Sequence, residues 1–259
     1  MNRISTTYSK PAPKDETFTP EPIRPLHVPD RIEDWPETRS KILDAWQAVI
    51  GQPAFDPTAA FDRSSEIVTN FEQDAYVGTV LLQPTTPTTR QTLLLMTPKK
   101  PVAESCPGMV IPFYDPDRMA GIDIRTQAPL LEEESAIQFG RHLAAQGYIV
   151  VCPEVFPFNT VPEPVNSAGM NWWQAAADQL RVDHPDWTGV GRLAWDASRA
   201  LDLLLEQPYI DTTRCGVMGH SLGGKIAFYA AALDTRFAAC VASDFGFGFS
   251  FTNWDDDWY

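Results

Sequence analysis

A serine lies at the centre of a glycine-flanked pentapeptide that could support nucleophilic catalysis. Residues 219–223 read Gly-His-Ser-Leu-Gly, which fits the pattern G-x-S-x-G. An apolar strand-like segment, RCGVMG, precedes the serine and a helix-like segment, LGGKIAFYAAALD, follows it, as a nucleophile elbow requires. The glycines two before and two after Ser221 leave room for so sharp a turn. Ser221 is therefore the predicted nucleophile, and the alternative is a tight structural turn that happens to contain a serine.

Acyl transfer to a serine also needs hydrogen-bond donors for the negative charge that develops on the carbonyl oxygen. In an elbow of this kind they are the backbone N–H after the nucleophile, here that of Leu222, and one N–H from the loop after the strand GMVIP. That loop offers Phe113 and Tyr114, and we favour Tyr114 because Pro112, just upstream, has no N–H. The alternative is that both aromatic side chains only cap the core.

A serine hydroxyl is a weak nucleophile without a general base, and after an elbow the expected chain order is serine, acid, histidine. No histidine follows Ser221; the four in the chain are His27, His142, His184 and His220. We expect His142 and His184 to be surface residues, and the side chain of His220 to point away from the serine. The chain is thus expected to lack its catalytic histidine and to be truncated one strand after the elbow.

Asp244 is the candidate acid within the chain. It follows FAACVAS, a strand expected beside the nucleophile strand, so its carboxylate would lie at the same end of the sheet as Ser221. There it could orient a histidine, and a loop or capping aspartate is an equal alternative. The chain has no H-x-H, H-E-x-x-H or Walker A pattern, so we expect neither a metal nor a cofactor.

The elements that must position these groups begin at about Tyr76. YVGTVLLQP and TLLLMTPKK read as an antiparallel hairpin, and GMVIP, YIVVCP, RCGVMG and FAACVAS as short apolar strands. Helical patterns occupy residues 130–147, 192–208 and 222–234. Short apolar strands that alternate with helices predict an α/β fold with a mostly parallel, doubly wound sheet covered on both faces.

Two further segments frame this domain. Residues 1–75 are expected to form an extended tail and one accessory helix at 37–50, before an incomplete α/β domain at 76–259. An insertion at about 155–188 contains the helical pattern NWWQAAADQLR and resembles a lid. Its tryptophans (Trp172, Trp173 and Trp187) could stack on sugar rings, and packing is the alternative.

Composition limits the possible partners of the chain. With 44% hydrophobic and 21% charged residues, its 259 residues can form a sizeable core. The formal net charge of −14 argues against nucleic acid as a partner. We see no apolar run long enough for a secretion signal or a membrane span, and expect a cytoplasmic protein with free thiols. The sequence leaves the oligomeric state open.

The same residues resemble a known family. The segments WTGVGRLAWDASRALDLL, RCGVMGHSLGGKIAFYAAALDTRFAACVAS, FTNWDDDWY and CPEVFPFN are similar to bacterial esterases of the dienelactone hydrolase and acetyl xylan esterase-like branch of the α/β-hydrolases. The resemblance covers about residues 78–259 and implies an α/β-hydrolase fold and ester hydrolysis. In those relatives the fold continues through further strands that carry the histidine.

A more distant resemblance is to the glucuronoyl esterases. They carry a lysine four residues after the nucleophile, matched by Lys225, and some place the acid where Asp244 stands. The resemblance implies that Lys225 contacts a substrate hydroxyl, and a lysine on the helix surface is the simpler alternative. Those enzymes have an arginine directly after the serine, where this chain has Leu222, which argues against a uronate ester as substrate.

Two hypotheses follow for the function. The first is a serine esterase that forms an acyl-enzyme on Ser221 and acts on a small-molecule or carbohydrate ester. The second is an inactive fragment or a non-catalytic binding protein of the same fold, because loss of one member of a catalytic triad abolishes most of the activity.

Overall fold

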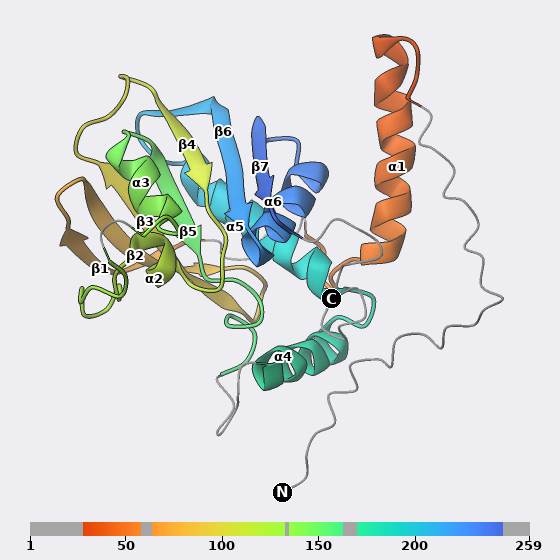
Figure 1. The fold of residues 1–259 in the computed structure, drawn as a ribbon. Helices are drawn as coiled ribbons and strands as arrows, with labels where there is room; N and C mark the ends of the chain where they lie inside the picture. Colours follow the sequence, from red (N-terminus) through yellow and green to blue (C-terminus); the bar gives the residue numbers. More distant parts are fainter. Residues whose placement is uncertain (1–27, 58–63, 133–134, 163–169, 246–259) are drawn as a thin grey trace, which may run out of the picture.

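A seven-stranded sheet organises the molecule (Figure 1). The computed structural model describes residues 28–57, 64–132, 135–162 and 170–245. The strand order is β1-β2-β3-β5-β4-β6-β7. The strands are β1 (Glu66–Glu72), β2 (Tyr76–Pro84), β3 (Arg90–Pro98), β4 (Cys106–Val110), β5 (Ile149–Pro153), β6 (Ile210–His220) and β7 (Ala239–Ser243). The first three strands are antiparallel, β3 pairs antiparallel with β5, and β5, β4, β6 and β7 run parallel.

Helices lie on both sides of this sheet. They are a short 3-10 helix (Ile32–Asp34), α1 (Trp35–Ile50), α2 (Pro116–Ala120), α3 (Phe139–Ala145), α4 (Met170–Asp183), α5 (Gly189–Leu205) and α6 (Leu222–Leu233). Alternate residues of β5 belong to different cores: Val151 packs with α5 and α6, and Val150 packs with α2 and α3. This alternation is what a buried parallel strand with helices on both faces requires.

The structure confirms the predicted α/β class and most of the predicted elements. β2 and β3 form the expected hairpin, and α1, α4, α5 and α6 lie where helices were expected. The helix predicted at 130–147 is wrong in extent, since α3 covers only seven residues. The sheet also starts before Tyr76: β1 was not predicted, because Phe71 is its only buried residue and the strand lies at the sheet edge.

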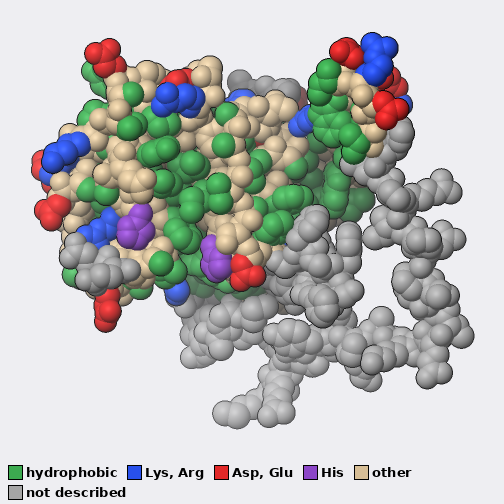
Figure 2. Space-filling view, turned by 45° about the horizontal axis from the view of Figure 1, so that its top comes forward, with side chains coloured by type: hydrophobic (Ala, Val, Ile, Leu, Met, Phe, Trp, Pro, Cys, Tyr) green, Lys and Arg blue, Asp and Glu red, His purple; other side chains and the backbone are tan. Residues whose placement is uncertain are grey.

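Among the described residues, one face of the sheet is partly exposed at β6 and β7. The Cys240 thiol donates to the Ala227 carbonyl of α6, so Val241, next in the strand, points to the opposite face. Val241 is 47% exposed, and Met218, its neighbour across the ladder, is half-buried. Figure 2 shows apolar side chains gathered over the strands. Helices thus cover both faces of the sheet as predicted, and the described residues leave Val241 exposed on the edge strand β7.

The structure also shows the state of the cysteines and the character of the helices. All four cysteines are free thiols, and three of them are buried; Cys240 is exposed because it lies on the edge strand β7. Among the helices that the structure describes, none is both long and apolar enough to cross a bilayer.

Candidate active site

Ser221 occupies a strained turn between β6 and α6. Its backbone has φ 54° and ψ −121°, a conformation that residues with a side chain rarely adopt, and the residue is exposed. A Cβ on Gly219 would lie 2.1 Å from the Gly223 carbonyl carbon, and one on Gly223 would lie 2.3 Å from the Pro112 carbonyl oxygen. The two glycines are thus required by backbone contact, as the motif predicted. The strained turn presents the serine to solvent.

Backbone N–H donors lie at the start of α6, directly after this serine. The N–H groups at the start of α6 point toward the turn and have no partner within the helix, which makes this end of the helix electropositive. The loop after β4 lies against the same turn, because a Cβ on Gly223 would also be 3.3 Å from Phe113 Cδ2. In the described part of the chain, no acceptor is paired with the N–H of Leu222, Phe113 or Tyr114.

The backbone brings Asp244 next to the serine. β7 runs parallel to β6 with His220 opposite Ser243, and the Ser221 N–H donates to the Ser243 carbonyl at 2.9 Å. Asp244 is the next residue after this contact; it is exposed and has a φ of 48°. The structure therefore places the predicted acid at the same end of the sheet as the predicted nucleophile.

The histidines of the described residues have hydrogen-bond partners other than Ser221. Nδ1 of His220 lies 3.3 Å from the Ser243 hydroxyl, and Nε2 of His142 lies 3.0 Å from the Ser135 carbonyl. His184 is not a surface residue as expected, since it packs between Phe55 and Trp187 and is 8% exposed. Across the described residues, no histidine is hydrogen-bonded to the Ser221 hydroxyl.

The environment of His184 explains its burial. Its Nδ1 accepts the Ala54 N–H at 3.2 Å, so the ring is held in a form with an unprotonated Nδ1. Burial lowers the pKa of His184, and the positive charge of Arg192 lowers it further. The sequence Asp-His-Pro is typical of a surface loop, and for that reason it did not indicate that His184 belongs to the core.

Lys225 is also buried. It lies in the first turn of α6 and is only 4% exposed, so the simpler prediction of a surface lysine is wrong. A helix packed against the sheet between β6 and β7 leaves little surface for this position. Its place one turn after Ser221 keeps it close to the elbow.

Aromatic rings extend from the elbow to α4. The ring of Phe113 contacts that of Tyr114 at a centroid distance of 4.7 Å, and Tyr114 contacts Phe158 and Trp173 at 6.1 and 6.2 Å. Trp172 completes the group through Phe158 at 4.7 Å. We call Phe113, Tyr114, Phe158, Trp172 and Trp173 the aromatic wall. Trp187, which the sequence grouped with these tryptophans, packs instead with Phe55, His184 and Trp195.

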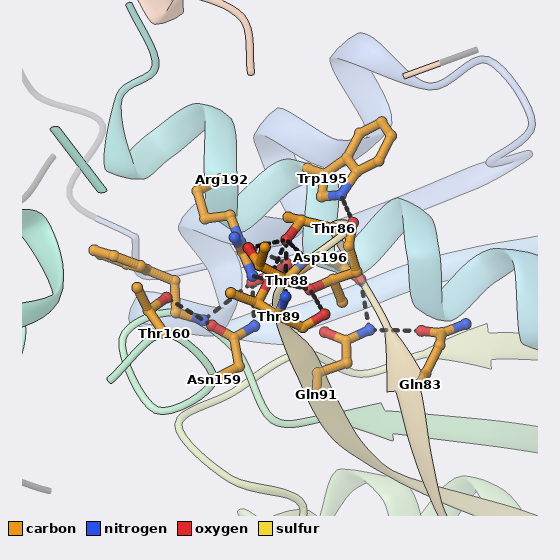
Figure 3. Close-up of polar contacts among 12 residues, drawn as sticks. Gln83, Thr86, Thr88, Thr89, Gln91, Asn159, Thr160, Arg192, Trp195 and Asp196 are labelled. Atoms are coloured by element: carbon orange, nitrogen blue, oxygen red, sulfur yellow. Dashed lines mark hydrogen bonds and ion pairs between the residues drawn. The ribbon is translucent and has the colours of Figure 1, made fainter. Parts of the chain in front are cut away.

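A buried polar network behind this wall was not predicted (Figure 3). Arg192 and Asp196, one helical turn apart on α5, form an ion pair of 2.8 Å with side-chain exposures of 1% and 0%. Burial raises the pKa of Asp196, and the guanidinium of Arg192 opposes that rise. An arginine and an aspartate at i, i+4 inside an apolar helix was the available sequence signal. The apolar periodicity of this segment predicts only a helix.

The sheet, the helices on both faces and the elbow define an α/β-hydrolase fold. The model of the Dienelactone hydrolase family matches residues 131–250, a stretch that includes the elbow. This match confirms the resemblance found in the sequence.

Individual proteins are similar to this chain in sequence or in fold. A curated carbohydrate esterase from an unknown prokaryotic organism is 30% identical over 107 residues, which cover 40% of this chain and 24% of that protein. The solved glucuronoyl esterase from Solibacter usitatus has a TM-score of 0.53 at 20% identity, covering 80% of this chain and 57% of that one. A Bacteroides fragilis protein provisionally assigned as an acetyl xylan esterase has a TM-score of 0.59 at 17% identity, covering 79% and 52%.

These proteins are longer than the chain described here. It spans little more than half of the two solved structures and about a quarter of the curated relative. At 20% identity or less, the structural likenesses show the fold.

Proposed function

We propose that the protein is a serine esterase that forms an acyl-enzyme on Ser221. The observation that carries this proposal is the strained, exposed placement of that serine between β6 and α6. Backbone strain of this size, about 1–3 kcal/mol, persists where the surrounding structure enforces it, which is common at active sites. The Ser221 side chain makes no capping hydrogen bond to α6, so it does not serve as the helix cap.

The reaction would run in two steps. Ser221 Oγ forms a bond to the ester carbonyl carbon, and its proton passes to a general base. The carbon–oxygen bond to the alcohol then breaks, and the alcohol leaves with that proton. Water attacks the acyl-serine in the same way and releases the acid, which restores the serine.

The backbone supplies the oxyanion site in this proposal. The Leu222 N–H points from the start of α6, and the loop at Phe113 and Tyr114 faces it across the contact with Gly223. The ring of Phe113 adjoins the elbow at Gly223, and the N–H groups of Phe113 and Tyr114 are both candidates for the second donor. These fixed dipoles stabilise negative charge on the carbonyl oxygen without reorganisation.

Asp244 would act as the acid that orients the base. Its position after β7, beside the Ser221–Ser243 backbone contact, supports this role. The base itself would be a histidine oriented by Asp244. The described residues do not bring one to the serine, so we infer that it comes from outside them.

An acylated carbohydrate is the substrate class that we favour. The similarity to a carbohydrate esterase supports it. The half-buried Tyr114 offers ring surface next to Phe113 at the elbow, and the half-buried Trp172 offers it at the α4 end of the aromatic wall. Lys225 lies one turn after the nucleophile and is buried, so it could contact a substrate hydroxyl only from beneath the surface of the site. Leu222 offers no charge to a uronate.

The test is hydrolysis of p-nitrophenyl acetate with added imidazole, which can replace a missing histidine base. We expect the wild-type rate to exceed the Ser221→Ala rate by a difference that grows with imidazole concentration, because the added base can activate the hydroxyl only where Ser221 is present. The variant corrects for hydrolysis by imidazole alone. Equal rates for both proteins would contradict the esterase proposal and favour the non-catalytic binding protein.

A further inference from the structure

The loop that follows β5 carries Phe158 of the aromatic wall and is fastened to α5. The Asp196 carboxylate accepts two hydrogen bonds from this loop through one oxygen, Oδ2. The Phe156 N–H donates at 3.2 Å and the Asn159 amide donates at 2.6 Å. The two contacts bracket Phe158, so the path of the backbone on both sides of that ring is fixed.

The carboxylate is itself held from the other side. Its second oxygen, Oδ1, accepts from Arg192 Nε at 2.8 Å. Arg192 in turn donates to the hydroxyls of Thr85 and Thr89, at 2.9 and 3.0 Å, in the turn between β2 and β3. Figure 3 shows these side chains converging from the hairpin, α5 and the loop. Asp196 therefore has a fixed position relative to the sheet.

A continuous series of contacts leads from this point to the nucleophile. Phe158 contacts the ring of Tyr114, Tyr114 contacts Phe113, and Phe113 lies against Gly223, two residues after Ser221. The same series passes through both residues whose N–H groups are candidates for the oxyanion site. A shift of the loop after β5 would thus move Phe113 and Tyr114, whose N–H groups are the candidate donors to the substrate's carbonyl oxygen.

We propose that Asp196 and Asn159 are positioning residues that hold the aromatic wall and the Phe113–Tyr114 loop against the Ser221 elbow. The catalytic part of this inference rests on the proposed esterase function. A buried ion pair adds little net stability over apolar packing, but it is directional. That property suits a role in fixing the geometry of the loop.

Asn159→Ala tests the proposal, because it removes the hydrogen bond from the Asn159 amide to Asp196 and leaves the Arg192–Asp196 ion pair intact. In protein labelled with 5-fluorotryptophan, we expect the ¹⁹F signals of Trp172 and Trp173 to shift or broaden. The signal of Trp46, which lies on α1 against Tyr229, should not change. With p-nitrophenyl acetate and imidazole we expect kcat to fall about tenfold or more, since small displacements near reacting groups have such effects. KM should change less.

Gln179→Ala is the matched control, because it removes an exposed amide that donates to an aspartate on α4. Spectra of Asn159→Ala that match this control would overturn the positioning role. A displaced wall with unchanged kcat would overturn its link to catalysis. If the wild-type protein has no Ser221-dependent activity, the esterase proposal fails. The ¹⁹F spectra then still decide whether the Asn159–Asp196 hydrogen bond positions the aromatic wall.

Discussion

At the scale of single residues, the elbow concentrates strain at the position that the proposed chemistry uses. Ser221 adopts φ 54° and ψ −121°, and the Gly219 and Gly223 backbones touch around it. A substitution at the serine should therefore change stability through the backbone more than through lost side-chain contacts, because its hydroxyl does not cap α6.

Ser221→Gly should be more stable than Ser221→Ala by about 1 kcal/mol or more, since glycine adopts a positive φ without the steric cost that a Cβ brings. Urea unfolding of the two variants measures the difference. If both variants have the same free energy of unfolding, the turn is not strained in solution.

His184 gives a second prediction at this scale. Burial lowers its pKa below the ordinary value of 6.5, so the folded protein binds fewer protons than the unfolded chain at mildly acidic pH. The stabilising contribution is complete above the unfolded pKa and is lost as pH falls from there toward the lower folded pKa.

His184→Asn removes this titration, while its amide oxygen can still accept the Ala54 N–H. We expect the free energy of unfolding to decline less in this variant than in wild type between pH 7.5 and 5.5. Guanidinium unfolding across that range provides the measurement. Parallel declines in the two proteins would show that His184 titrates normally.

At the scale of elements, the edge strand β7 has two different sides. One side packs on α6 through Cys240, and the other presents Val241 at 47% exposure. An exposed apolar edge strand is a place where a sheet can accept further polypeptide. In this molecule the same strand also delivers Asp244 to the elbow.

Val241→Lys should change the free energy of unfolding by no more than about 0.5 kcal/mol, as for most surface substitutions. Val217→Lys, at a fully buried position of β6, should prevent folding because it buries an unpaired charge. Thermal unfolding followed by circular dichroism compares them. A large loss of stability in Val241→Lys would mean that residues outside the described set cover this face.

At the scale of the whole molecule, two cores on opposite faces of the sheet have different roles. The core with α5 and α6 contains the elbow helix and the buried Arg192–Asp196 pair. The core with α2 and α3 supports the hairpin side of the sheet. The proposed site lies where the loops after β4 and β5 meet the elbow after β6, which is the end of the parallel strands where open α/β sheets bind ligands.

The sequence by itself determined the class of the fold, the elbow and the neighbourhood of Ser221 and Asp244. These features depend on local patterns, such as apolar strands that alternate with helices and glycines at fixed distances from a serine. They also depend on parallel pairing of consecutive strands, which places strand ends at one edge. Leu222, Phe113 and Tyr114 followed from the same logic, and their catalytic roles stay predictions.

Only the tertiary structure decided which polar residues are buried. His184 and Lys225 were expected at the surface, and the helical pattern did not single out Arg192 and Asp196, yet all four are less than 9% exposed. Their burial depends on contacts between distant segments, such as the bonds from Arg192 to the β2–β3 turn about 100 residues earlier. A one-dimensional pattern does not contain those contacts, because burial of a polar group is favourable only where partners from elsewhere in the chain complete its hydrogen bonds.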